Sequence, residues 1–150
     1  MKEDRGDISA GQIALAISTD HTFRIPAIRM AEARANHGGE TWMYEFDWKS
    51  KAFNGALGAC HALEIPFTFG TLGVNGTDVF LGTSELPHAL EDLMHKSWAA
   101  FIATGNPITQ RLPEWPTYSP NSRTVMRFAD HTELTQDPWP SARNSWEGIR

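Results

Sequence analysis

The sequence reads Gly58-Ala59-Cys60-His61-Ala62-Leu63-Glu64-Ile65-Pro66-Phe67-Thr68-Phe69-Gly70 across the stretch that decides the fold. Just before this stretch, aromatic residues occupy every second position, at Trp42, Tyr44, Phe46 and Trp48. A period of two in β-prone residues predicts a strand over 41–48. Residues 49–58 include Asn54-Gly55 and Gly58, which favour a surface loop. His61 is therefore expected just beyond a loop that follows a strand.

Two helices are expected before this strand and one long helix after it. Apolar spacing predicts a short helix over 8–16, with Asp7 or Ser9 as its cap. A second helix is predicted over 23–36, with Pro26 in its early turn and His37-Gly38-Gly39 as its end. In the long helix, over 86–102, apolar residues recur at intervals of three and four, and Gly105 ends it. Ser84 is expected to cap this long helix.

The other segments are expected to be mostly irregular. Pro66, Gly70, Gly73 and Gly76 predict irregular structure until Ser84. A short strand is predicted over 124–128, a loop over 130–141 and a last helical turn over 142–148. The chain length of 150 residues suits one domain or a piece of one.

Composition excludes several classes of partner. The 13 basic and 18 acidic residues give a net charge of −5, and the basic residues are scattered, so no nucleic-acid partner is expected. No run of about 18 apolar residues occurs, so no membrane partner is expected either. Cys60 is the one cysteine, and residues 1–7 lack the apolar core of a signal peptide. These features favour a reducing, cytoplasmic location.

The residues alone suggest three kinds of chemistry. His88 and His95 share a helix face, but no further ligand lies at metal-site spacing, so neither a metal nor another cofactor is expected. Cys60 and His61 are adjacent and point apart on an extended chain, so Cys60 is expected to be buried and inert. Gly82-Thr83-Ser84 lacks the second glycine of a G-x-S-x-G serine elbow. His61 is thus left with no catalytic partner identified by the residues.

The stretch around His61 resembles the histidine motif of type-B carboxylesterases, the family of para-nitrobenzyl esterases and cholinesterases. The resemblance covers residues 18–148 or so, in the order and spacing of the last third of a bacterial family member. It also rests on these segments: Phe23-Arg24-Ile25-Pro26-Ala27, Thr41-Trp42-Met43-Tyr44-Glu45-Phe46, Trp98-Ala99-Ala100-Phe101, Gly105-Asn106-Pro107, and Trp115-Pro116 with Tyr118.

The resemblance implies an α/β fold, specifically the C-terminal part of an α/β-hydrolase fold, with a few strands of the central sheet and packing helices. Residues 1–150 would form one segment without an internal domain boundary. His61 would be the general base and acid of a Ser-Glu/Asp-His triad. Glu64 and Gly58 would support its loop, and Phe67 and Phe69 could line a pocket wall.

The family's serine elbow, triad acid and oxyanion hole have no counterpart in these 150 residues. The chain alone is therefore expected to be inactive towards its carboxylic-ester substrate. We expect it to pair with a missing N-terminal portion or to self-associate, because a few strands leave open edges and uncovered apolar faces. The alternative is a noncatalytic, cholinesterase-like binding module in which His61 is structural. A G-x-S-x-G motif and an acidic residue encoded upstream of Met1 would favour the esterase.

Overall fold

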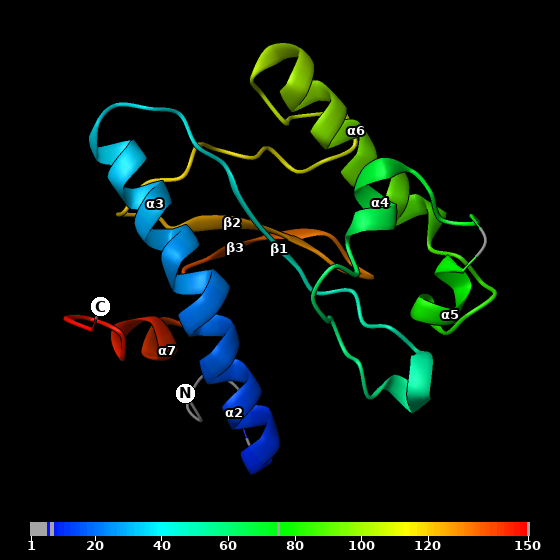
Figure 1. Cartoon of the computed structure of the whole chain (residues 1–150). Coiled ribbons are helices and arrows are strands. Elements are labelled where there is room, and N and C mark those ends of the chain that lie inside the picture. Colours follow the sequence, from blue (N-terminus) through cyan, green and yellow to red (C-terminus); the bar gives the residue numbers. More distant parts are fainter. Residues whose placement is uncertain (1–5, 7, 75, 150) are drawn as a thin grey trace. The chain divides into compact units, whose positions relative to one another are not determined.

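A computed structural model describes residues 6, 8–74 and 76–149 of the chain (Figure 1). The fold contains two compact units, each described separately below. The first unit combines the described residues up to Met43 with Thr117–Val125 and the described residues from Thr135 onwards. The second unit combines Tyr44–Pro116 with Met126–Leu134. The expectation that the chain has no domain boundary stays a prediction.

The first unit is dominated by one uninterrupted helical run. α2 (Ala10–Thr19) continues through a π-helical turn (Asp20–Arg24) into α3 (Ile25–Asn36), as the blue to cyan ribbon of Figure 1 shows. Both helices are predicted in these places, but no local signal in the sequence indicates that they join. Pro26 explains the π turn, because a proline inside a helix lacks the N–H donor and needs extra room against the preceding turn. The N–H of Ile25 accordingly bonds five residues back, to the carbonyl of Asp20.

The two ends of this helical run follow the sequence signals. Ser9 caps α2 and forms a capping box with Gln12, since each side chain bonds the backbone N–H of the other residue. The other cap candidate, Asp7, lies outside the described residues. α3 ends at His37, and Gly38 follows with a φ of 74°. The predicted stop is confirmed.

A buried ion pair fixes the π turn within the first unit. Asp20 is fully buried, and its carboxylate accepts hydrogen bonds of 2.7 and 3.2 Å from Arg24. Arg24 also donates to the carbonyl of Pro138, just before α7 (Pro140–Asn144). The helical turn expected over 142–148 corresponds to α7, which begins earlier than predicted.

Three short strands form one sheet in the order β1-β2-β3, namely β1 (Met43–Phe46), β2 (Thr124–Phe128) and β3 (Glu133–Gln136). Each strand has residues in both compact units. β2 matches its predicted range, whereas β1 is shorter than predicted. The loop predicted over 130–141 is wrong, because β3 lies inside it. Glu-Leu-Thr-Gln has a single apolar residue, so pairing with β2, and not local pattern, makes it a strand.

The second unit contains three helices after a short 3₁₀ turn (Ala52–Gly55). These are α4 (Ile65–Phe69), α5 (Thr77–Leu81) and α6 (His88–Thr104). α6 confirms the predicted long helix, and Gly105 ends it in the left-handed conformation. The irregular structure predicted from Pro66 until Ser84 is wrong in two places, because α4 and α5 lie there. Helices of five residues are too short to show periodicity, and Gly70 and Gly82 are in fact their left-handed ends.

The N-terminus of α6 differs from the prediction. Pro87 is the cap residue, and its side chain makes no capping hydrogen bond. The carbonyl of Pro87 instead accepts the backbone N–H groups of Leu90 and Glu91, at 3.0 and 3.1 Å. Ser84 lies outside the helix, so its predicted capping role is wrong.

The apolar face predicted for α6 is only partly covered. Leu90, Met94 and Ser97 are buried, whereas Phe101 and Ile102, one turn further on, are 43% and 80% exposed. Other exposed aromatic side chains include those of Phe23, Phe53 and Phe69. Trp48, which follows β1, is buried. No helix in the described part of the chain is both long and apolar enough to cross a membrane.

Candidate active-site segment

His61 lies in a tight turn between the loop at 50–58 and α4. The turn is closed by the N–H of Leu63 on the carbonyl of Cys60, at 3.2 Å, and by the N–H of Ile65 on the carbonyl of Ala62, at 3.3 Å. Leu63 is completely buried, while His61 is exposed. The buried leucine thus anchors the turn, and the imidazole side chain is accessible from outside this unit.

The residue after His61 has an unusual backbone conformation. Ala62 has a φ of 67°, in the left-handed region that costs a non-glycine residue about 1–2 kcal/mol. Such a conformation persists where the surrounding structure over-determines it, and it is concentrated at functional sites. The turn that presents His61 is therefore held by contacts on both sides of it.

The loop before His61 is tied to the end of α5 through Ser50. The N–H of Ser50 donates to the carbonyl of Gly58 at 3.1 Å, and its buried hydroxyl donates to the carbonyl of Phe80 at 2.8 Å. The same hydroxyl accepts the N–H of Ala52 at 3.0 Å. Gly58 has a φ of 56°, which favours glycine at this point. The support role of Gly58 stays a prediction, and these bonds give it a physical basis.

Gly82, from the string Gly82-Thr83-Ser84, packs against the same loop. A Cβ atom at this position would lie 1.9 Å from the backbone nitrogen of Ala52. The N–H of Lys51 bonds the carbonyl of Leu81 at 2.9 Å, which fixes this close approach. Contact between two backbone segments therefore accounts for the glycine here.

Glu64 lies at the junction between the His61 turn and α4. Its carbonyl accepts the N–H of Thr68 at 2.9 Å, in the first turn of the helix. Burial raises the pKa of Tyr44 on β1, and the negative charge of Glu64 raises it further, while a hydrogen bond from Trp98 on α6 acts in the opposite direction. The carboxylate of Glu64 is thus close enough to interact with a half-buried phenol of the sheet.

The two phenylalanines of the motif have different surroundings. Phe67 is completely buried, and its ring centroid lies 5.0 Å from that of Phe46 and 5.4 Å from that of Trp48. Phe69 is 69% exposed. Phe67 contributes to the core that joins α4 to the strand segment, and a pocket-wall role for either residue stays a prediction.

The histidines of α6 contact different groups. His88 Nδ1 lies 2.7 Å from a carboxylate oxygen of Glu91, and His95 Nδ1 lies 3.0 Å from the carbonyl oxygen of Thr68. Among the described residues, no group of three or more His, Cys, Asp and Glu side chains could hold a metal ion. Cys60 is partly exposed, which corrects the expectation that it is buried. The turn at 60–63 buries Leu63 instead.

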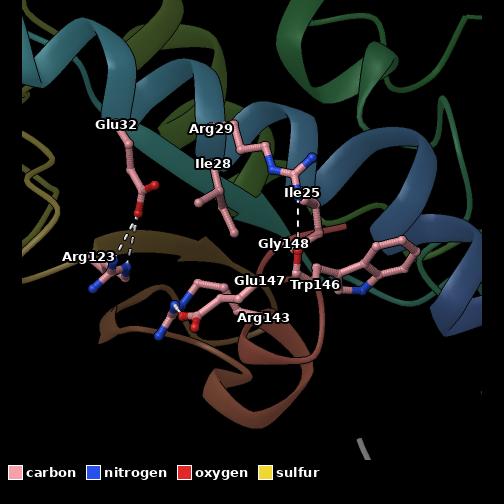
Figure 2. Close-up of a pocket in the computed structure, with 9 residues that line it drawn as sticks. All are labelled: Ile25, Ile28, Arg29, Glu32, Arg123, Arg143, Trp146, Glu147 and Gly148. Carbon is pink, nitrogen blue, oxygen red and sulfur yellow. Dashed lines mark hydrogen bonds and ion pairs between the residues drawn. The ribbon is translucent and has the colours of Figure 1, made fainter. Parts of the chain in front are cut away.

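A cavity of about 220 Å³ lies in the first unit (Figure 2). It is lined by Ile25, Ile28, Arg29, Glu32, Arg123, Arg143, Trp146, Glu147 and Gly148. Figure 2 shows Arg123 directed at Glu32, at 3.0 Å, and Arg29 directed at the backbone of the Trp146 segment. The guanidinium groups are therefore engaged by protein acceptors, and no residue of the His61 motif lines the cavity. Its residues come from distant segments, so no sequence motif marked it.

The comparisons with known proteins agree with the architecture of this segment. The model of the carboxylesterase family matches residues 2–146. The chain belongs to the carboxylesterase family. Para-nitrobenzyl esterase of Bacillus subtilis is 34% identical to it over 125 residues, and phenmedipham hydrolase of Pseudarthrobacter oxydans is 32% identical over 126 residues. These alignments cover 80% and 79% of this chain.

A solved structure of a Geobacillus stearothermophilus carboxylesterase matches 94% of the chain with a TM-score of 0.79 and 32% sequence identity. This carboxylesterase thus has the α/β-hydrolase fold in common with the chain, as expected from the His61 motif. The chain spans 24% of the length of each of the two bacterial relatives and 29% of the Geobacillus chain.

Proposed function

We propose that this carboxylesterase segment supplies the general base and acid of carboxylic-ester hydrolysis, and that His61 is the residue that does so. The single observation that carries the proposal is the placement of an exposed His61 on a tight, strained turn inside a family motif. An accessible imidazole on a well-fixed turn is what proton transfer to and from a reacting oxygen requires.

The chemistry follows the serine hydrolase scheme. The imidazole of His61 takes the proton of a serine hydroxyl as the serine oxygen attacks the ester carbonyl, and it then gives that proton to the departing alcohol. In the second half, the imidazole takes a proton from water, which attacks the acyl-serine, and returns it to the serine oxygen. A carboxylate on the other ring nitrogen holds the required tautomer.

The serine, the triad acid and the oxyanion hole would come from a further polypeptide segment, because no G-x-S-x-G sequence occurs in the 150 residues. We propose that this segment is the remainder of an esterase domain. The exposed side chains of Phe69, Phe101 and Ile102 support the proposal, since apolar surface of this kind is typical of a site covered by another element. The three-stranded sheet supports it as well, because its edge strands would accept further strands.

A complementation assay tests the proposal. The 150-residue protein is assayed for p-nitrophenyl ester hydrolysis alone and after mixing with the part of the Bacillus subtilis para-nitrobenzyl esterase that it does not match. We expect no turnover by the chain alone and turnover after mixing that His61→Gln abolishes. Turnover by the chain alone that His61→Ala abolishes would reveal a nucleophile within these residues. A stable complex without turnover would favour the noncatalytic binding module.

A further inference from the structure

Two polar side chains on α6 contact the segment that follows His61, and a third contacts one of these two. His88, Glu91 and His95 are spaced by three and four residues, so they lie along one side of the helix. Glu91 Oε1 accepts the backbone N–H of Leu72 at 2.8 Å, and His95 Nδ1 donates to the carbonyl of Thr68 at 3.0 Å. His88 Nδ1 lies 2.7 Å from the other carboxylate oxygen of Glu91 and so fixes its rotamer. α6 therefore contacts the backbone at two points on the segment from Thr68 to Leu72.

These two backbone groups are ones that α4 cannot pair by itself. α4 has five residues, and the last carbonyl groups of a helix have no partner within it. Thr68 is the penultimate residue of α4, and Leu72 lies beyond its left-handed end at Gly70. A helix of this length is also not stable in isolation. Glu91 and His95 thus satisfy backbone groups at and just beyond the C-terminal end of α4.

The position of α4 is transmitted to His61 through the backbone. The N–H of Ile65, at the start of α4, closes the turn on the carbonyl of Ala62, next to His61. Ala62 has a left-handed conformation, which persists where the surrounding structure over-determines it. Buried Leu63 fixes one end, and α4 fixes the other. A change at the α6 contacts would therefore free the imidazole to move.

We propose that Glu91 and His95 are positioning residues for His61, acting through α4. The inference rests on the proposed function of His61. It assigns a role in that function to two residues that lie more than 25 positions from His61 in the sequence. Neither residue touches the imidazole in this account. Their contribution is to keep one orientation of the turn populated.

The test is made by nuclear magnetic resonance on the 150-residue protein, so it requires no turnover. Amide exchange of Leu72 and the ring signals of His61 are compared in the wild type, Glu91→Ala, Glu91→Gln, His95→Ala and the control Asp92→Asn. Asp92 lies on the same helix but pairs with Lys96 and Arg111 at the surface. Amide signals of α3 report whether each variant remains folded.

We expect Leu72 to exchange about tenfold faster or more in Glu91→Ala, because a hydrogen bond to a charged acceptor is lost. Glu91→Gln keeps an acceptor oxygen and should restore much of the protection. The ring signals of His61 should split or broaden in Glu91→Ala and in His95→Ala but not in Asp92→Asn. His95→Ala keeps the test decisive if Glu91→Ala does not fold.

Unchanged His61 signals in a folded variant with a fast-exchanging Leu72 amide would overturn the proposal. So would an equal effect of Asp92→Asn. Failure of the esterase assay would contradict the proposed function of the segment, and it would leave the measured coupling between Glu91 and His61 intact. The two failures are therefore distinguishable.

Discussion

The substitution Gly82→Ala should be among the most damaging single-methyl changes in this chain. Gly82 ends α5 with a φ of 71°, and a Cβ atom there would lie 1.9 Å from the nitrogen and 2.3 Å from the Cα atom of Ala52. Both neighbours are backbone atoms, so no side-chain rotation can relieve the overlap. The 50–58 loop must then move away from the end of α5.

The magnitude follows from what that movement breaks. The left-handed conformation alone costs alanine about 1–2 kcal/mol. The displacement also removes the bond from the N–H of Lys51 to the carbonyl of Leu81 and the bond from the hydroxyl of Ser50 to the carbonyl of Phe80. At about 1 kcal/mol each, these bring the expected loss of unfolding free energy to about 3–4 kcal/mol.

Gly105→Ala is the matched control, because Gly105 ends α6 in the same conformation, with a φ of 78°, and a Cβ atom there would meet nothing within 4 Å. It should cost about 1–2 kcal/mol, from backbone conformation alone. Urea unfolding followed by tryptophan fluorescence gives both free energies. The reasoning is refuted if the two variants are equally destabilised, or if Gly82→Ala is within about 0.5 kcal/mol of the wild type.

Three further predictions concern charge and burial. Asp20→Ala removes the carboxylate that pairs with Arg24, whose side chain is only 13% exposed. The free energy of unfolding, measured in urea, should fall by about 3–5 kcal/mol. A fall below about 1 kcal/mol would contradict the buried pair. A hydrogen bond from Arg143 is the main cause that lowers the pKa of Asp137, so this pair stabilises the fold above the unfolded-state pKa of about 3.9 and loses its effect as pH falls through the lower folded value. As pH is lowered below about 4, the free energy of unfolding should fall less steeply in Asp137→Asn than in the wild type, and identical slopes would argue against the pair. Burial raises the pKa of both tyrosines, and the charge of Glu64 raises that of Tyr44 further, as the charge of Glu32 does for Tyr118. Tyrosinate absorbance of the folded protein should therefore appear only above about pH 10. Titration of both phenols at their usual pKa would show that they are solvated.

The sequence predicts those parts of this fold that carry a long or repeated local signal. α6 has seventeen residues, and its apolar spacing extends over several turns, so its place could be read directly. The same holds for Ser9, one of the two cap candidates of α2, and for β2. The motif around His61 places the turn of the candidate site without any structure.

The missed elements are short and depend on contacts that are distant in sequence. α4 and α5 have five residues each, which is less than two helical turns, and β3 is a strand because it pairs with β2. The bond between Glu91 and the N–H of Leu72 spans 19 positions. No local pattern encodes such a contact, so the support of the His61 turn by α6 becomes visible only in three dimensions.

The exposure of the α6 face shows a different limit of sequence reasoning. Periodicity groups Leu90, Met94, Phe101 and Ile102 on one apolar face, but it does not tell which part of that face is covered. In the structure, the first half is buried and the second half is exposed. The pattern thus predicts the helix correctly and also marks surface that another polypeptide would cover.

The most direct test of the central claim is the kcat of a chimera in which the residues of this chain replace the segment that they match in the Bacillus subtilis para-nitrobenzyl esterase. We predict hydrolysis of a p-nitrophenyl ester and a loss of about a thousandfold or more in kcat for His61→Gln. His37→Gln, which changes an exposed histidine bonded to the carbonyl of Ala33, should leave kcat unchanged. A folded chimera that hydrolyses the ester equally fast with and without His61 would contradict the account.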